Sequence, residues 1–134
     1  MDHLLKFHHI GIACRDIEKT KAFYTSMGYV AAPTVPDPIQ HVNVCFLEHA
    51  DGPRMELLEP LDEQSPVTRT LAAVGVSPYH TCYEVEDIDN AIVALRQQRF
   101  ILVNGPVNAR ALDDRRIAFM FNKNSGLIEL VETR

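Results

Sequence analysis

The chain has 134 residues and a formal net charge of −5, and 46% of its residues are hydrophobic. This length fits one compact domain or two very small modules with a shared core, and this hydrophobic fraction excludes disorder as the main state. The acidic charge argues against a nucleic-acid partner held mainly through its phosphates. No apolar run is long enough to cross a membrane.

The N-terminus and the cysteines indicate the cellular compartment. Residues 1–6 have neither the basic start nor the long apolar core of a signal peptide. Cys14, Cys45 and Cys82 are widely spaced and odd in number, which suits buried thiols in a reducing compartment better than a disulfide framework. We therefore predict a cytoplasmic protein.

The first half of the chain alternates strand and helix patterns. In the first predicted strand, His9 shares one face with the small residues Gly11 and Ala13, whereas Ile10 and Ile12 lie on the packing face. In the later segments, apolar periodicity indicates further strands and a helix, and glycine- and proline-rich stretches indicate turns and loops. In chain order, the predicted elements are a strand over 7–14, a helix capped by Asp16 and ended by Gly28, a short strand near Val30, a loop over 31–40, and strands over 42–47 and 54–59.

The second half repeats this order after a connector helix. Ser65 and Pro66 are a typical helix start, and Gly75 ends the connector. The predicted elements that follow are a strand over 79–85, a helix capped by Asp87, a strand over 100–103, a turn over 104–106, an irregular charged loop over 108–114, and strands over 117–120 and 126–132.

An internal repeat relates the two halves and decides the fold. It predicts an α+β protein of two tandem β-α-β-β-β modules with a pseudo-twofold relation. We expect a single domain over 1–134, with module 1 over about 6–60, the connector helix over about 65–75 and module 2 over about 78–134. The matching positions are His9 and His80 (80 − 9 = 71), Asp16 and Asp87 (87 − 16 = 71), and Glu56 and Glu129 (129 − 56 = 73).

Each module supplies one histidine near the start of its first strand and one glutamate inside its last strand. A carboxylate on an apolar strand is costly unless something compensates its charge. The repeat predicts that His9, Glu56, His80 and Glu129 meet and share a cation. Two imidazoles and two carboxylates suit a divalent ion such as Zn, Ni, Co, Mn or Fe(II).

Each of these residues also has a purely structural interpretation. A single histidine on a strand is usually a core or surface residue, and a single glutamate usually faces solvent. The metal hypothesis depends on the pair occurring twice at matching places.

The repeat, the start His9-Ile10-Gly11-Ile12-Ala13 and the two Glu-Leu-(Leu/Val)-Glu strands resemble the vicinal oxygen chelate superfamily over residues 7–132. This superfamily includes glyoxalase I, methylmalonyl-CoA epimerase, extradiol dioxygenases and antibiotic-resistance binding proteins. The resemblance implies paired modules whose mixed sheet forms a metal-lined cup. It also implies a homodimer, and a set of metal ligands made of His9, Glu56, His80 and Glu129.

Within the superfamily, the segment 55–61 followed by Ser65-Pro66-Val67 is most similar to methylmalonyl-CoA epimerases. The segment 79–88 is similar as well, although Tyr79 stands where epimerases have a first histidine. Further departures are Val44, where some epimerases place a second catalytic carboxylate, and the stretch 108–123, which differs from the usual glycine-rich and Phe-Leu-His-Pro-Lys pattern.

The resemblance implies an isomerase or epimerase that acts through a metal-stabilised enolate on a small-molecule acyl-thioester, such as a coenzyme A or other thiol conjugate. Glu129, and secondarily Glu56, would move the proton. The alternatives are a glyoxalase I-type lyase acting on a thiol hemithioacetal, and a metal-free small-molecule-binding protein of the resistance type. Arg110, Arg115, Arg116 and Lys123 are candidate phosphate contacts, with a solvated loop as the structural alternative.

Overall fold

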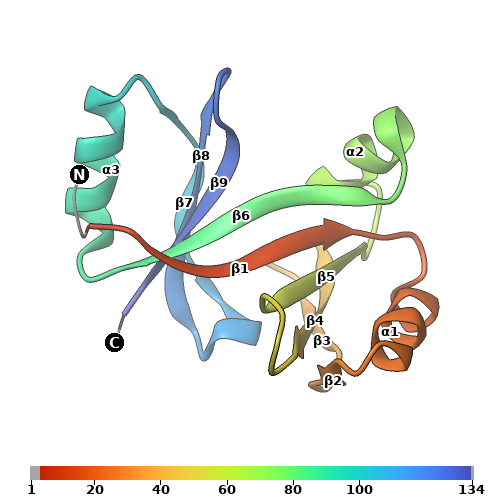
Figure 1. Ribbon diagram of the computed structural model, residues 1–134. Coiled ribbons are helices and arrows are strands. Elements are labelled where there is room, and N and C mark those ends of the chain that lie inside the picture. Colours follow the sequence, from red (N-terminus) through yellow and green to blue (C-terminus); the bar gives the residue numbers. More distant parts are fainter. Residues whose placement is uncertain (1–3, 134) are drawn as a thin grey trace. The chain divides into compact units, whose positions relative to one another are not determined.

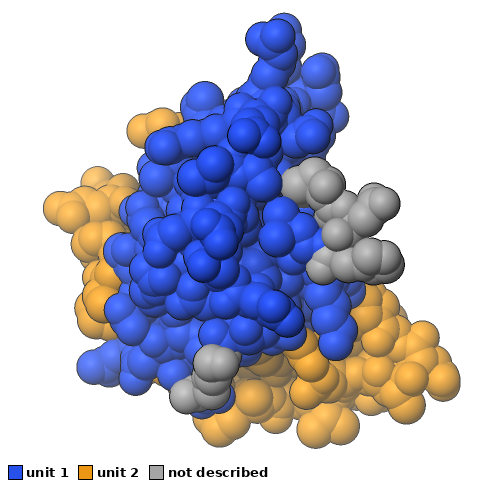
Figure 2. All heavy atoms as spheres, turned by 90° about the vertical axis from the view of Figure 1, so that its left-hand side faces the viewer, with its two compact units in different colours: residues 1–8, 80–134 blue, residues 9–79 orange. Residues whose placement is uncertain are grey.

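The computed structural model describes residues 4–133, which fold as two compact units. The N-terminal unit comprises His9–Tyr79, and the C-terminal unit comprises the described residues up to His8 and from His80 onward (Figure 2). The part of the signal-peptide expectation that concerns residues 1–3 lies outside the described residues. In the described chain, no helix has the length and apolar character needed to span a membrane.

The N-terminal unit is a mixed sheet that packs against a helix (Figure 1). Its strands follow the order β2-β4-β5-β1, and β3 pairs with β4. Strand β1 is parallel to β5, and the other pairs are antiparallel. Ile17 and Tyr24 of the first helix pack on Ile12 and Leu57 of the sheet. The elements are β1 (Lys6–Ala13, which belongs to this unit from His9 onward), α1 (Ile17–Ser26), β2 (Val30–Ala31), β3 (Val35–Asp37), β4 (Val42–Glu48), β5 (Met55–Pro60) and α2 (Pro66–Val74).

The C-terminal unit repeats this plan with the strand order β6-β9-β8-β7. Strand β6 is parallel to β9, and the pairs β9–β8 and β8–β7 are antiparallel. Helix α3 covers one face of this sheet (Figure 1). Its Ile92 and Leu95 form a core with Met120 and Leu130 of the sheet. The elements are β6 (Ser77–Val85, which belongs to this unit from His80 onward), α3 (Ile88–Gln97), β7 (Ile101–Ala109), a short 3₁₀-helix η1 (Arg110–Leu112), β8 (Arg115–Asn122) and β9 (Gly126–Glu132).

The predicted helix caps and the repeated element order are confirmed. The carboxylate of Asp16 accepts a hydrogen bond from the Lys19 N–H at 3.1 Å, and that of Asp87 accepts one from the Asn90 N–H at 3.0 Å. An aspartate at this place satisfies backbone donors that the first turn of a helix leaves without a partner. The same residue type therefore starts the main helix of each unit.

The predicted loop over 31–40 contains one short strand, so this part of the prediction was wrong. Strand β3 pairs with β4, with Val35 opposite Val44. The buried carboxylate of Asp37 accepts bonds from the backbone N–H groups of Ile39 and Gln40, both at 3.1 Å. Proline lacks an N–H but is tolerated on an edge strand, so a proline-rich stretch still pairs.

The turn predicted over 104–106 was also wrong, because strand β7 continues through it to Ala109 with two shifts in its register against β8. Such bulges let a strand pass an irregular position without ending. Gly105 has φ +97°, and a Cβ atom there would lie 2.6 Å from the carbonyl oxygen of Ile117. Glycine is needed because the strands approach closely, and not because the chain turns. The loop predicted over 108–114 is partly ordered: its first two residues belong to β7, and Arg110–Leu112 form the 3₁₀-helix η1.

Candidate metal-binding residues and their relatives

In the N-terminal unit, His9 of β1 and Glu56 of β5 form a buried pair. Glu56 is paired in register with Gly11, two residues after His9, so both side chains lie on the same face of the sheet. His9 Nε2 lies 3.1 Å from Glu56 Oε1. Phe46, opposite Glu56 on β4, directs its ring edge-on to the imidazole, with the ring centroids 5.1 Å apart.

In the C-terminal unit, His80 of β6 and Glu129 of β9 repeat this arrangement. Glu129 is paired in register with Cys82, two residues after His80. His80 Nε2 lies 2.9 Å from Glu129 Oε1. Phe119, opposite Glu129 on β8, packs edge-on against the His80 ring at 5.4 Å. The two aromatic residues are separated by 73 residues (119 − 46), as the glutamates are. Their role beside the histidines was not predicted from the sequence.

His9, Glu56, His80 and Glu129 are candidate metal-binding residues, and all four are buried. Each unit offers one imidazole nitrogen and one carboxylate oxygen, which suit borderline divalent ions. The separations within the pairs, 3.1 and 2.9 Å, place one imidazole nitrogen and one carboxylate oxygen side by side in each unit.

A second glutamate three residues after each candidate ligand anchors the same strand to a helix. Glu59 accepts a hydrogen bond from the Ile17 N–H at 2.8 Å, and Glu132 accepts one from the Ile88 N–H at 2.9 Å. Each of these N–H groups belongs to the first residue of a helix, where a carboxylate is favourable. The strand that carries each candidate ligand is thereby fixed to the helix of its own unit.

Two of the four candidate phosphate contacts lie in ion pairs. Arg115 Nη1 donates to Glu84 Oε2 at 2.8 Å. Arg116 donates to both carboxylate oxygens of Glu132 at 3.0 Å, and this contact holds the pKa of Glu132 below its usual value. The other two, Arg110 in η1 and Lys123 in the β8–β9 turn, are exposed.

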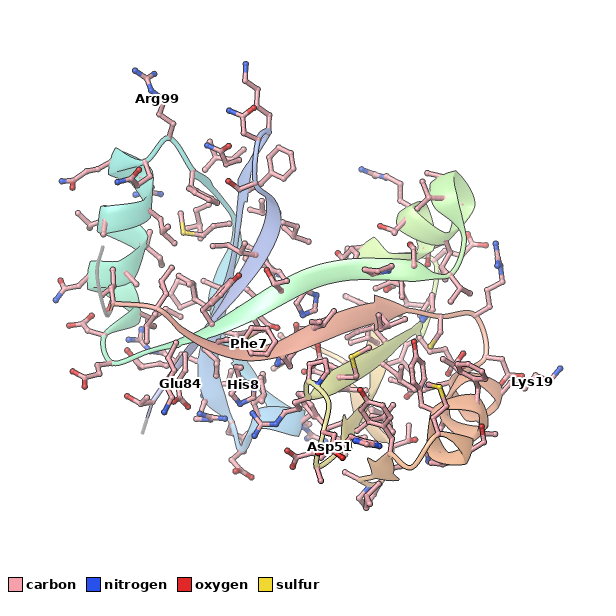
Figure 3. All side chains as sticks on the ribbon, viewed as in Figure 1. Phe7, His8, Lys19, Asp51, Glu84 and Arg99 are labelled. Carbon is pink, nitrogen blue, oxygen red and sulfur yellow. The ribbon has the colours of Figure 1, made fainter. Side chains whose placement is uncertain are left out.

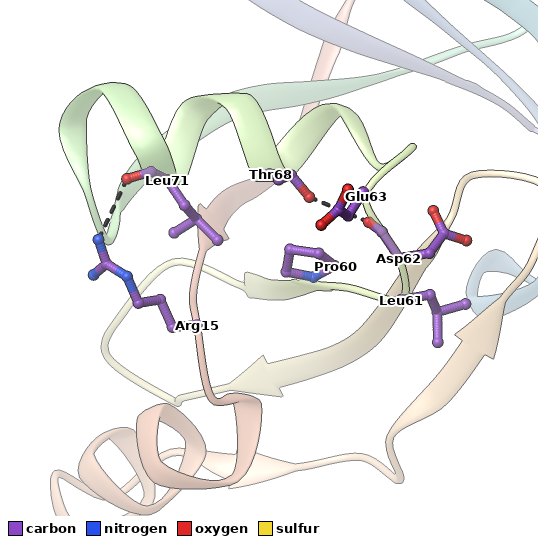
Figure 4. Close-up of a pocket in the computed structure, with 7 residues that line it drawn as sticks. All are labelled: Arg15, Pro60, Leu61, Asp62, Glu63, Thr68 and Leu71. Atoms are coloured by element: carbon purple, nitrogen blue, oxygen red, sulfur yellow. Dashed lines mark hydrogen bonds between the residues drawn. The ribbon is translucent and has the colours of Figure 1, made fainter.

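A pocket of 370 Å³ in the N-terminal unit lies between the end of β5 and α2 (Figure 4). Arg15 Nη2 donates to the carbonyl oxygen of Leu71 at 3.3 Å, and the Thr68 hydroxyl donates to that of Asp62 at 3.2 Å. None of the predicted ligands lines this pocket. The histidine–glutamate pairs therefore lie outside this pocket.

Comparison with known proteins places the chain in a family. The sequence profile of the Glyoxalase/Bleomycin resistance protein/Dioxygenase superfamily matches residues 8–119. The chain belongs to this superfamily. It also has the fold of the superfamily: the crystal structure of methylmalonyl-CoA epimerase from Mycobacterium tuberculosis matches with a TM-score of 0.87 and 27% identity, over 100% of this chain and 92% of that one.

Several relatives are methylmalonyl-CoA epimerases. The human mitochondrial epimerase is 32% identical, over 96% of this chain and 74% of the relative. A methylmalonyl-CoA epimerase structure in complex with methylmalonyl-CoA and NH4+ matches with a TM-score of 0.82 and 30% identity, over 97% of this chain and 95% of that chain. The resemblance inferred from the motifs is thus confirmed.

Proposed function

We propose that this chain is a divalent-metal-dependent epimerase that acts on a methylmalonyl-type acyl-CoA thioester. The observation that carries the proposal is the buried histidine–glutamate pair, present once in each unit of a chain that is similar to methylmalonyl-CoA epimerases. Solved relatives contain methylmalonyl-CoA or 2-nitronate-propionyl-CoA, which supports a coenzyme A thioester as the substrate.

We assign His9, Glu56, His80 and Glu129 as ligands of one divalent ion, whose identity among Zn, Ni, Co, Mn and Fe(II) is open. When bound, the ion supplies Lewis-acid stabilisation of the negative charge that develops on substrate oxygens. The support is the donor set of each pair and its repetition.

The carboxylates of Glu129 and Glu56 are the groups that would transfer the proton. The carbon between the thioester and the carboxylate of the substrate bears the proton to be moved, and its removal and return on the other face inverts the configuration. Glu129 is the first candidate for the base, and Glu56 is the second. His80, held edge-on by Phe119, keeps the Glu129 carboxylate in place, and the 2% exposure of Glu129 limits competing water.

We further propose that the enzyme is cytoplasmic and works as a homodimer. The support is the superfamily resemblance and the three cysteines, which are all buried free thiols.

Solvent-deuterium exchange into methylmalonyl-CoA, followed by NMR, tests the function. Protein reconstituted with Co, Ni, Mn or Zn is expected to catalyse exchange at the carbon between the two carbonyl groups. Glu129→Gln and Glu56→Gln are each expected to slow the exchange at least about 100-fold, because they remove an acid–base group. Glu86→Gln is the matched control, since Glu86 is an exposed carboxylate of the C-terminal unit.

Absence of exchange with every metal, in protein shown to hold the ion, would contradict the epimerase assignment. Conversion of the methylglyoxal–glutathione hemithioacetal by the same preparation would then support the glyoxalase-type alternative. Exchange that proceeds at the wild-type rate in both glutamate variants would remove these residues from the mechanism.

A further inference from the structure

Another pocket lies in the C-terminal unit, on the face of the sheet that α3 covers. It lies between Leu95 of α3, Thr81 of β6 and Ile128 of β9, has a volume of about 450 Å³, and is named the α3 pocket below. Small-molecule sites have volumes of about 300–1,000 Å³. Neighbouring residues of a strand project from opposite faces of a sheet, so Ile128 points away from the face that bears Glu129. The α3 pocket is therefore separate from the histidine–glutamate pair of this unit.

The inner wall of the α3 pocket is apolar. Leu95 and Ile128 are 2% and 6% exposed and belong to the core under α3. Leu5 and Phe100 pack against the same core and also line the pocket. The Phe100 N–H donates to the carbonyl oxygen of Leu95 at 3.1 Å, which holds Phe100 at the end of the helix. An apolar molecule gains affinity on this wall because its surface is removed from water.

Two hydroxyl groups of β6 provide polar contacts in the α3 pocket. Thr81 and Tyr83 are two residues apart on the strand, and both line the pocket. Phe7 packs edge-on against the Tyr83 ring, with the ring centroids 6.2 Å apart, and so restrains its position. Within residues 4–133, neither hydroxyl group has a hydrogen-bond partner. Because a hydroxyl group both donates and accepts, the pair offers hydrogen bonds to a polar group of a ligand.

The β8–β9 turn borders the α3 pocket and is tied to the end of α3. The Asn122 side-chain amide donates to the carbonyl oxygens of Gln98 and Arg99 at 3.3 and 3.2 Å. Ser125 of this turn and Gln98 both line the pocket. The rim of the pocket is therefore polar but neutral.

The charges around the α3 pocket restrict the class of ligand. Among the described residues that line it, none has a charged side chain. Arg99, which lies between the lining residues Gln98 and Phe100, extends away from the sheet (Figure 3). Burying a charged group without a partner is costly. The pocket therefore favours a neutral polar group over a carboxylate or an ammonium group.

We propose that the α3 pocket binds a small neutral molecule that has an apolar body and one hydroxyl or carbonyl group. The body lies on the apolar wall, and the polar group forms hydrogen bonds with the hydroxyl groups of Thr81 and Tyr83. This site goes beyond the proposed function, since it lies on the opposite face of the sheet from Glu129 and requires neither a metal ion nor an acyl-thioester.

NMR titration of the nitrogen-15-labelled full-length chain at pH 7 tests this proposal with three probes that share one alkyl chain: 1-octanol, octanoate and octylammonium. 1-Octanol is expected to shift the amide signals of Thr81, Phe100 and Ile128, and the shifts are expected to saturate. The two charged probes are expected to bind at least about tenfold more weakly, because their charge would be buried without a partner.

Variants of the lining residues locate the binding site. Ser125→Trp is expected to abolish the saturable shifts, because the larger side chain occupies the pocket from an exposed turn. Thr81→Val combined with Tyr83→Phe is expected to weaken 1-octanol about fivefold, because it removes both hydroxyl groups and keeps the shape of the wall. Thr70→Val combined with Tyr24→Phe, at half-buried positions of the N-terminal unit, is the matched control and should leave binding unchanged.

Shifts that do not saturate, or that map to residues outside the α3 pocket, would overturn the site. Binding of octanoate or octylammonium as tight as that of 1-octanol would overturn the neutral class of ligand. Equal weakening by the control pair would overturn the role of the two hydroxyl groups. The experiment uses no thioester and no metal ion, so its failure would leave the proposed epimerase function standing.

Discussion

At the scale of single residues, each candidate ligand histidine is held from two sides. Burying a carboxylate costs several kcal/mol unless a partner compensates its charge. The Glu56 carboxylate lies 3.1 Å from the His9 imidazole, and the Glu129 carboxylate lies 2.9 Å from the His80 imidazole. The edge-on phenylalanine beside each imidazole adds about 1 kcal/mol of aromatic contact. The ring orientation is therefore fixed before any ion binds, which is what a metal site requires.

The three cysteines are expected to be unreactive in the native protein. All are fully buried, and burial raises the pKa of the Cys14 thiol to about 11 and also raises that of Cys45. The thiolate is the reactive form, so almost none is present at Cys14 at pH 8, and burial lowers the thiolate fraction of Cys45 as well. Cys82 is protected by its burial. Ellman's reagent is expected to label no thiol in native protein and three thiols in urea. Rapid labelling of one thiol with the fold intact would contradict this.

The four candidate ligands could be predicted from sequence because the repeat places them at matching positions. Phe46 and Phe119 carry the same 73-residue separation, but a phenylalanine in a strand has the pattern of an ordinary core residue. The ion pairs of the arginines could not be foreseen. Arg115 and its partner Glu84 are 31 residues apart, and nothing in their local sequence marks them as neighbours.

At the scale of secondary structure elements, a second repeated network connects strand to helix in each unit. Besides the helix N–H, Glu59 accepts a bond from the Asn43 side chain at 2.9 Å, and Glu132 accepts bonds from Arg116 at 3.0 Å. Asn43 and Arg116 are also 73 residues apart (116 − 43). The partner of the glutamate is the neutral Asn43 in the N-terminal unit and the charged Arg116 in the C-terminal unit. Of these two networks, the one in the C-terminal unit therefore contains an ion pair.

Glu132→Gln is expected to destabilise the protein by about 1–3 kcal/mol at pH 7, because it removes one partner of a charge-assisted network. Arg116 lowers the folded-state pKa of Glu132 below the ordinary value of 4.5 for a glutamate. The stabilisation is therefore complete above the unfolded-state pKa and is lost as the pH falls through the lower folded value. Urea unfolding at pH 7 and at pH 3 measures the effect. The variant and the wild type should differ less at pH 3, and Asp51→Asn, at an exposed carboxylate, serves as the control.

A difference between variant and wild type that does not shrink at low pH would assign the effect to lost packing rather than to the charge.

The helices and most strands could be predicted because alternation and capping residues are local signals. The final strand has the predicted bounds 126–132, and Asp16, Ser65 and Asp87 each begin a helix as expected. The errors, β3 and the long β7, involve proline and glycine. Whether Gly105 forms a turn or a bulge depends on the carbonyl oxygen of Ile117, which belongs to another strand.

At the scale of the whole molecule, the repeat gives each unit one half of the proposed ligand set. Each unit has its own histidine, glutamate and phenylalanine, and each has its own glutamate that fixes the ligand strand to a helix. One pair supplies two ligands, and divalent ions such as Zn take at least four. Tight binding by the proposed site therefore requires both pairs.

Metal binding is accordingly expected to show a stoichiometry of one ion per chain and to stabilise the fold by mass action. At 100 times the dissociation constant the gain is about 2.7 kcal/mol, or about 10 °C in Tm for a chain of this size. Thermal unfolding and metal analysis of wild type, His9→Ala and His80→Ala measure it. Each substitution alone should abolish both the bound ion and the shift, whereas His49→Ala should keep them. Two ions per chain in the wild type, with one retained in each variant, would show that the pairs bind independently and would refute the shared site.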